Sequence, residues 1–209
     1  MTEKARVEAF SDGVLAIAIT LLVLELRVPD PDQLSHGLAH YLSEQWSSYA
    51  AYLLSFIVIG IMWVNHHGLF ARVVKVDRPL LLLNLHLLLW IAVLPFPTAL
   101  VARYIRHGDD ARVAMAVYSG VMFATSVAWI LLWLWITHDD RLLHQDIDHR
   151  VARSTARRFG AGLVVYGATV VVSFLSPVLA LVLHFLIAGY YVADQLAMRP
   201  PGPARSAPP

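Results

Sequence analysis

Arg6-Val7-Glu8-Ala9-Phe10-Ser11-Asp12-Gly13 leads directly into an apolar run that ends near Val28. The apolar part alone, residues 13–28, would form a helix of about 24 Å at 1.5 Å per residue, whereas the hydrocarbon core of a bilayer is roughly 30 Å thick. We therefore predict that the helix begins before Gly13 and includes the Phe-Ser-Asp-Gly segment. This places the Asp12 carboxylate near one face of a membrane.

The composition of the whole chain is that of an integral membrane protein. Of its 209 residues, 58% are hydrophobic and 15% are charged, whereas charged residues make up about a quarter of an average soluble domain. The formal net charge of +1 provides no basic field for nucleic acid, so we expect no nucleic-acid partner. The absence of cysteine excludes disulfides and thiolate metal sites.

Continuous apolar stretches favour membrane helices over the alternating strands of a barrel. We predict an all-α integral membrane domain of six transmembrane helices over residues 1–198. A disordered, proline-rich cytoplasmic tail is expected over residues 199–209. The turn at Ser176-Pro177 is so short that it leaves open whether both of the last two helices cross fully. The approximate bounds of the six helices are 13–28, 44–70, 79–101, 112–137, 155–175 and 177–196.

Basic residues are divided unequally between the two sides that six spans define. Most of the 16 Lys and Arg residues fall in the N-terminus, the segments 71–78 and 138–158, and the C-terminus. By the positive-inside rule, this distribution predicts a multi-pass protein of the cell membrane with both termini in the cytoplasm.

Polar residues of the second and third helices are expected at the depth of Asp12. The second helix descends to Trp63, His66 and His67, and the third begins on the same side, close to Asn84. Such residues are costly in lipid unless they face protein partners. We predict a buried polar network that ties the first three helices together, although separate contacts with lipid headgroups are the alternative. Its expected members are Arg6, Ser11, Asp12, His66, His67 and Asn84.

An apolar stripe with 4-3-4 spacing continues along the first helix, formed by Ile17, Leu21, Leu24 and Val28. Thr20 lies at the edge of this stripe, and Glu25 continues it from Leu21. Periodicity alone favours a face that packs against other helices. A stripe that lines a pore and gates it by dewetting is the alternative, and composition does not choose between the two.

The run Arg6-x-x-x-Phe10-Ser11-Asp12-Gly13 resembles the signature of the transmembrane-protein-175-type potassium channels. The resemblance covers about residues 4–196 and includes the six-helix layout. The second helix contributes Trp63-x-x-His66 with His67, and the third contributes Asn84 followed by Leu94-Pro95-Phe96. The first motif is specific, because it matches over a contiguous stretch of eight residues, whereas the later motifs are degenerate.

This resemblance implies a homotetramer in which the first helix of each subunit lines a central pore, and it favours pore lining for the stripe. Hydrophobic constrictions are implied at Ile17, Leu21 and Leu24, with a hydroxyl layer at Thr20. Glu25 could attract cations at the outer mouth, or pair with Arg27 or a loop. The remaining motif residues are implied to support the pore helix: Arg6, Phe10, Ser11, Asp12, Gly13, Trp63, His66, His67 and Asn84.

The implied function is a passive, potassium-preferring cation channel in the lipid bilayer that needs no cofactor beyond the permeant ion. The absence of a Thr-Val-Gly-Tyr-Gly loop agrees with a hydrophobic constriction in place of a carbonyl filter. Ten histidines and the Asp12–His66 pair suggest an alternative, a proton-conducting channel or proton-coupled transporter.

An enzyme is not expected, because the sequence contains no His-Glu-x-x-His, Gly-x-Ser-x-Gly or Walker motif. No metal site is predicted either. His66 and His67 are neighbours on a helix, so their side chains diverge by about 100° and are poorly placed to bind one ion.

Overall fold

The computed structural model describes residues 2–33, 37–138 and 149–197, and the elements of this part of the chain are all helices. The predicted all-α fold is confirmed. The expected tail over residues 199–209 lies outside the described residues. In chain order, the helices are α1 (Glu3–Leu21), η1 (Leu22–Glu25), η2 (Pro31–Gln33), α2 (Leu38–Glu44), α3 (Trp46–Phe70), α4 (Arg78–Val93), α5 (Pro95–Tyr104), α6 (Gly108–His138), α7 (His149–Leu175) and α8 (Pro177–Ala197).

The first helix begins well before the apolar run, as predicted from the length that a helix needs to cross the bilayer. The Thr2 hydroxyl accepts a hydrogen bond from the Ala5 backbone N–H at 3.3 Å and caps the N-terminus of α1. The other end differs from the prediction, because the helix tightens into η1 and Leu26 is already extended. Val28 therefore lies outside the helix. Its neighbour Pro29 disfavours a helical conformation in the residue that precedes it.

The predicted third helix consists of two helices in one continuous path. α4 ends at Val93, Leu94 remains in the right-handed helical region, and α5 follows from Pro95. Because proline has no backbone N–H and its ring crowds the preceding turn, the regular hydrogen-bond ladder is interrupted there. The path extends to Tyr104, beyond the predicted end at residue 101.

The structure has a helix at each of the six predicted positions. Among the described residues, α7 has the shortest apolar part of the six, Gly160–Leu175, which is about 24 Å long at 1.5 Å per residue. The other five have segments that are long and apolar enough to cross a membrane: Glu3–Glu25, Trp46–Phe70, Arg78–Tyr104, Gly108–His138 and Pro177–Leu196.

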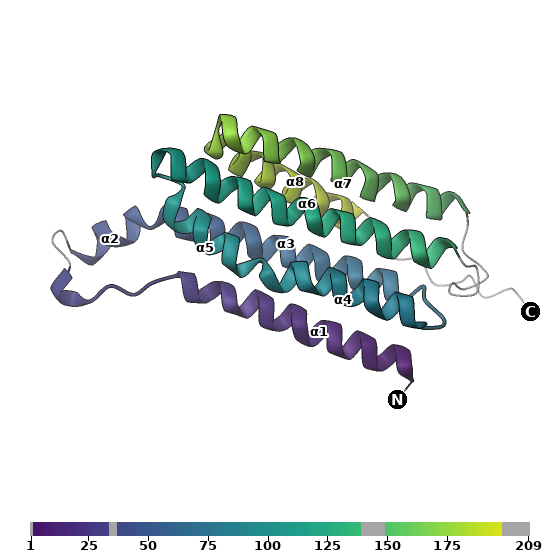
Figure 1. Cartoon of the computed structure of the whole chain (residues 1–209). Helices are drawn as coiled ribbons and strands as arrows, with labels where there is room; N and C mark the ends of the chain where they lie inside the picture. Colours follow the sequence, from purple (N-terminus) through teal and green to yellow (C-terminus); the bar gives the residue numbers. More distant parts are fainter. Residues whose placement is uncertain (1, 34–36, 139–148, 198–209) are drawn as a thin grey trace, which may run out of the picture.

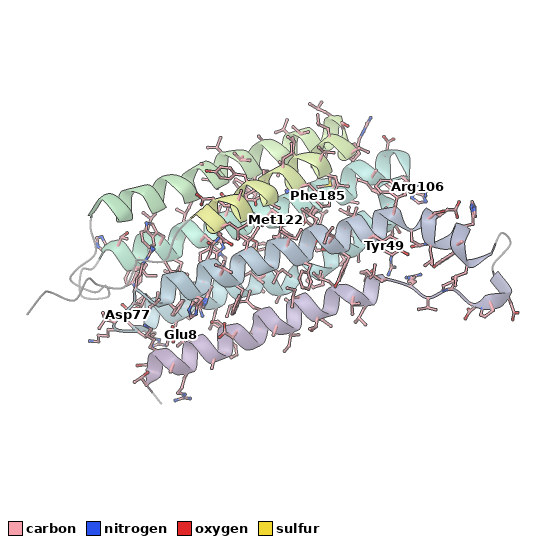
Figure 2. The ribbon with its side chains drawn as sticks, turned by 180° about the vertical axis from the view of Figure 1, so that it is seen from behind. Glu8, Tyr49, Asp77, Arg106, Met122 and Phe185 are labelled. Atoms are coloured by element: carbon pink, nitrogen blue, oxygen red, sulfur yellow. The ribbon has the colours of Figure 1, made fainter. Side chains whose placement is uncertain are left out.

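The helices form an elongated bundle, with α1 along one edge (Figure 1). α1 contacts α3 and α4, while α6, α7 and α8 contact one another on the other side of the bundle. Figure 2 shows polar side chains at the two ends, with Glu8 and Asp77 at one end and Tyr49 and Arg106 at the other. The middle of the bundle is formed by apolar residues of all the long helices.

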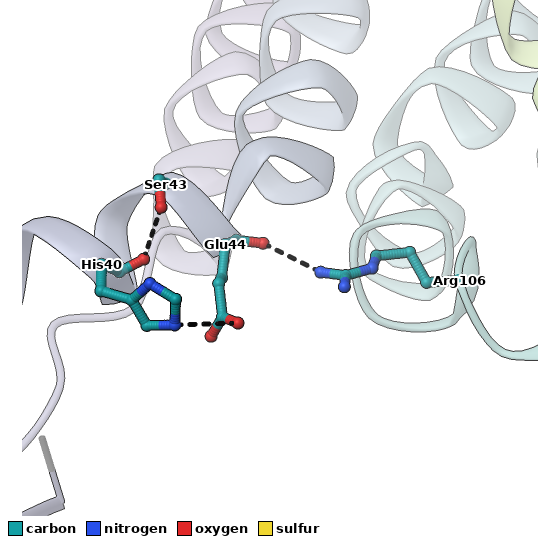
Figure 3. Close-up of polar contacts among 4 residues, drawn as sticks. All are labelled: His40, Ser43, Glu44 and Arg106. Carbon is teal, nitrogen blue, oxygen red and sulfur yellow. Dashed lines mark hydrogen bonds and ion pairs between the residues drawn. The ribbon is translucent and has the colours of Figure 1, made fainter. Parts of the chain in front are cut away.

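The segment between α1 and α3 projects past the end of the bundle and carries the short helix α2 (Figure 1). Its attachment is shown in Figure 3, where an Arg106 guanidinium N–H donates to the Glu44 backbone carbonyl at 3.3 Å. Within α2, the Ser43 hydroxyl donates to the His40 carbonyl, and the His40 ring lies 3.3 Å from the Glu44 carboxylate. This end is therefore held by exposed polar contacts, which contribute little to stability.

Candidate pore helix and its supporting network

One face of α1 and its η1 extension is buried against the bundle. Its residues recur every three or four positions, which places them on the same side of a helix. This face contacts α3 and α4. The buried residues are Val7, Ser11, Leu15, Ala18 and Leu22.

The pore residues predicted from the sequence lie on the side of α1 that the other described residues leave uncovered. Ile17 is 61% exposed, Leu21 43% and Leu24 69%, and the Thr20 side chain is also exposed. The switch to a 3-10 turn brings Leu24 almost directly above Leu21, because side chains three residues apart eclipse in that geometry. The result is a nearly straight apolar strip, which requires either lipid or another subunit to cover it.

Three of the predicted network residues form a buried chain of hydrogen bonds between α1, α4 and α3. The Asn84 amide N–H donates to the Ser11 hydroxyl oxygen at 2.9 Å, and the His66 Nε2–H donates to the Asn84 carbonyl oxygen at 2.9 Å. The Ser11 hydroxyl itself donates to the Val7 carbonyl. All three side chains are almost fully buried. The chain fixes the rotation of α1 against the bundle, since leaving these groups without partners would be costly.

Aromatic contacts hold the His66 ring in this position. The ring stacks on Phe70, one turn further along α3, with centroids 4.4 Å apart. It also meets the Trp129 ring of α6 edge to face, with centroids 6.4 Å apart. His66 therefore connects α6 to the network that holds α1.

Asp12 pairs with Trp63 and not with His66, the partner predicted from the sequence. The Trp63 indole N–H donates to the Asp12 carboxylate at 2.9 Å, and both side chains are exposed. The Trp63 ring stacks on His67, with centroids 6.3 Å apart. The two adjacent histidines therefore have different surroundings. His66 joins the buried chain of hydrogen bonds, and His67 lies beside the exposed Asp12–Trp63 contact.

The other motif residues lie apart from these contacts. Among the described residues, no hydrogen bond or ion pair joins Arg6 to the network, and its side chain is exposed. The predicted membership of Arg6 is therefore not seen within the single chain. Phe10 is exposed, and a Cβ built on Gly13 would meet open space. All three are available to a neighbouring subunit or to lipid.

Replacing Trp63 by Phe tests the exposed branch of this arrangement. The substitution removes the indole donor but keeps an aromatic ring, and Asp12 can then be solvated. We expect the free energy of unfolding to fall by only about 0.5 kcal/mol, because an exposed group that loses its partner is not left dry. Thermal unfolding of the purified protein measures the change. A loss of stability as large as the one expected from breaking the buried Ser11–Asn84–His66 hydrogen bonds would show that Asp12 is desolvated in the assembled protein.

Glu25 pairs with neither of its predicted alternatives, Arg27 or a loop. Its carboxylate lies 3.3 Å from the Arg103 guanidinium of α5, and its side chain is only 18% exposed. This ion pair turns Glu25 toward its own subunit and partly neutralises its charge. The contact offers a direct test of the predicted outer-mouth role.

For Glu25→Gln, we expect potassium flux in liposomes to change by less than about twofold, because an ion-paired carboxylate attracts external cations weakly. The companion variant Arg103→Gln should raise flux at low salt, since it releases the Glu25 charge. A severalfold loss of flux in Glu25→Gln at low salt, recovered at high salt, would instead place a free carboxylate at the pore mouth.

A second polar layer was not singled out from the sequence. The Ser55 hydroxyl lies 2.7 Å from that of Thr98 and 3.2 Å from that of Tyr118, which joins α3, α5 and α6. The Ser119 hydroxyl lies 3.0 Å from that of Ser173 and 2.9 Å from His184 Nε2, which joins α6, α7 and α8. The signal in the sequence is weak, because single hydroxyl residues in apolar helices have no distinctive spacing.

Taken with the buried network and the uncovered strip on α1, the fold defines an all-helical integral membrane protein. A family model described as the endosomal/lysosomal potassium channel TMEM175 matches residues 6–95. A potassium channel of Streptomyces collinus is 49% identical, over 99% of this chain and 98% of that protein. The chain belongs to the TMEM175 family of ion channels, which are not enzymes.

Two further comparisons extend this result. The crystal structure of a lysosomal potassium-selective channel TMEM175 homolog from Chamaesiphon minutus superposes with a TM-score of 0.86 and 37% identity, over 94% of this chain and 100% of that chain. The endosomal/lysosomal proton channel TMEM175 of Gallus gallus is 38% identical over 68% of this chain, which corresponds to 30% of that protein.

Proposed function

We propose that the protein is a potassium-preferring cation channel whose pore is lined by α1 of four identical subunits. The observation that carries this proposal is the uncovered strip of Ile17, Leu21 and Leu24 opposite the packed face of α1. A relative that matches the chain over almost its full length is named a potassium channel, and that name supports potassium as the preferred ion.

The position of α1 at the edge of the bundle supports assembly as a closed ring (Figure 1). A ring of four copies about an axis beside α1 would bring four such strips together and remove them from lipid. Such a cyclic arrangement needs two different surfaces of each subunit to meet, and it closes without free ends. Phe10, an exposed side chain of α1, lies on this edge and can contribute to the contact.

In this arrangement, the Ile17 side chains form a ring that excludes hydrated ions when the pore is closed. A narrow apolar neck dewets, and opening widens it so that water returns. Potassium sheds its hydration water at a lower cost than sodium, so an apolar neck favours potassium. Thr20 adds a polar layer one turn away: its hydroxyl donates to the carbonyls of Ala16 and Ile17 at 2.9 Å, which leaves its oxygen lone pairs for a cation.

We also propose that the protein lies in the cell membrane and that both of its termini are on the cytoplasmic side. The start of α1, the end of α3 and the start of α4 lie at the same end of the bundle (Figure 1), and the connecting segment 71–78 is rich in basic residues. The positive-inside rule assigns this end to the cytoplasm. The Ser11–Asn84–His66 chain then lies in the cytoplasmic half, about 9 Å along the helix from Ile17.

The proposal is tested by ion flux from liposomes that contain the purified protein. We expect potassium gradients to drive flux that exceeds sodium flux, with protein-free liposomes as the control. A pH-sensitive dye inside the same liposomes measures proton movement. Proton movement that greatly exceeds the potassium flux, as the name of the Gallus gallus relative would suggest, would contradict potassium as the main permeant ion.

A further inference from the structure

A polar cleft of about 550 Å³ opens at the end of the bundle that carries Tyr49 and Arg106 (Figure 2). Four segments line it: the chain around the end of η1, α2, the first turn of α3, and the chain around the end of α5. The cleft is half open, and most of its surface is polar. Its volume lies within the range of about 300–1,000 Å³ that is typical of small-ligand sites.

Arginine side chains give this cleft its electrostatic character. With His107 left aside, the wall carries three positive and two negative residues. These residues are Arg27, Arg103, Arg106, Glu25 and Glu44. The wall therefore has an excess of one positive charge. This charge lies beside the low-dielectric interior of the bundle, so it attracts an anion more strongly than it would in bulk water.

Two of the three guanidinium groups lack a carboxylate partner. Arg103 is paired with the Glu25 carboxylate at 3.3 Å. Within the described part of the chain, the only partner of Arg106 is neutral, the Glu44 backbone carbonyl at 3.3 Å (Figure 3). Among the described residues, no hydrogen bond or ion pair involves the exposed Arg27 side chain. A guanidinium presents five N–H donors in one plane, and this geometry matches two oxygens of a phosphate group.

We propose that this cleft binds a phosphate group, and the residues beside it favour a phospholipid headgroup as the source. Leu38 and Leu42 lie one turn apart on α2, and Trp46 follows at the start of α3; all three side chains are exposed. Tryptophan is enriched where a membrane meets water. Acyl chains can therefore pack against these three residues while the headgroup phosphate reaches the arginines.

The charge of the cleft favours an anionic lipid such as phosphatidylglycerol. The phosphodiester of this lipid carries a single negative charge, which balances the excess on the wall, and its glycerol headgroup carries no positive charge. Phosphatidylcholine has the same phosphodiester, but its choline group would bring a positive charge close to Arg27 and Arg106. Inorganic phosphate has no acyl chain and gains nothing from the apolar residues. The site does not depend on the proposed channel function.

Binding is tested by native mass spectrometry of the purified full-length protein in detergent, titrated with phosphatidylglycerol or phosphatidylcholine of the same acyl chains. We expect phosphatidylglycerol to bind at least about fivefold more tightly. Arg27→Gln removes one guanidinium and breaks no contact among the described residues, so the protein should fold normally. Its affinity for phosphatidylglycerol should fall at least about fivefold, and Arg106→Gln should show a similar loss.

Arg112→Gln is the matched control, because Arg112 is an exposed arginine near the start of α6, at the same end of the bundle. It pairs with Asp109 at 3.2 Å and does not line the cleft. Its affinity for phosphatidylglycerol should stay within about twofold of the wild type. Equal affinities of the wild type for the two lipids, or equal losses in Arg27→Gln and Arg112→Gln, would overturn lipid binding at this cleft.

A separate titration with inorganic phosphate distinguishes the source of the phosphate group. Isothermal titration calorimetry of the protein in the same detergent should show no saturable binding below about 10 mM. Tighter binding of inorganic phosphate that is lost in Arg27→Gln, without a preference for phosphatidylglycerol, would keep the phosphate site and overturn the lipid as its source. A protein that binds neither probe in a manner that depends on Arg27 would overturn the whole proposal.

Discussion

Replacing Ile17 by Asn should raise potassium flux about tenfold and reduce the preference for potassium over sodium. The ring of four Ile17 side chains is the proposed barrier, and a tenfold change corresponds to lowering it by about 1.4 kcal/mol. An amide group hydrates the neck and prevents dewetting, and it also offers oxygen to both ions. Flux of each ion from liposomes, measured beside the wild type at equal protein density, gives both quantities.

Val23→Asn is the matched control for this experiment. Val23 is 50% exposed and lies on the same helical segment. Successive side chains of the 3-10 turn are about 120° apart, so Val23 projects away from Leu24 and from the apolar strip. The same polar group there should alter flux by less than about threefold. Equal effects of the two variants would indicate a general loosening of α1, and an unchanged flux and preference in Ile17→Asn would remove Ile17 from the constriction.

Replacing Asn84 by Leu should destabilise the protein by about 2 kcal/mol. Asn84 accepts from His66 and donates to Ser11, and all three residues are almost fully buried. The substitution leaves the His66 Nε2–H without an acceptor in an apolar setting, and desolvation without compensation is the main cost. Hydrogen bonds between membrane helices average only about 0.6 kcal/mol, so the loss of two bonds alone would cost less. Thermal unfolding in detergent measures the difference.

Ser11→Ala completes a double-mutant cycle with this variant. By itself, it should cost about 1 kcal/mol, because it leaves one Asn84 N–H without an acceptor. In the Asn84→Leu background it should cost almost nothing, since the bond is already absent. Strictly additive costs would show that the Ser11–Asn84 bond is not formed in the membrane-embedded protein.

The helical fold and the depth of the polar residues could be predicted from the sequence because a membrane restricts both. A bilayer of fixed thickness requires α1 to begin before Gly13, as it does. Alternating helix directions then bring Ser11, His66 and Asn84 to one level. Their shared depth makes a network that includes these three residues predictable, whereas the individual hydrogen bonds depend on how the helices are rotated.

Partners that depend on helix rotation or on a distant segment could not be predicted in the same way. Asp12 and His66 share a depth but not a face, and the indole of Trp63 reaches Asp12 instead. Glu25 meets Arg103 because α5 packs against η1, which spacing along the chain does not reveal. The role of Arg6 depends on contacts beyond the single chain.

The central claim is that the exposed face of α1 lines the ion pathway, and cysteine accessibility tests it most directly. The chain contains no cysteine, so single substitutions can be made without altering the background. Ile17→Cys, Leu21→Cys and Leu24→Cys are compared with Leu85→Cys, an exposed position on α4. Silver ions, which resemble potassium in size and bind thiolates, are added to liposomes during potassium flux. We predict rapid block in the three α1 variants and none at Leu85. Block at Leu85→Cys with unimpeded flux in all three α1 variants would contradict the account.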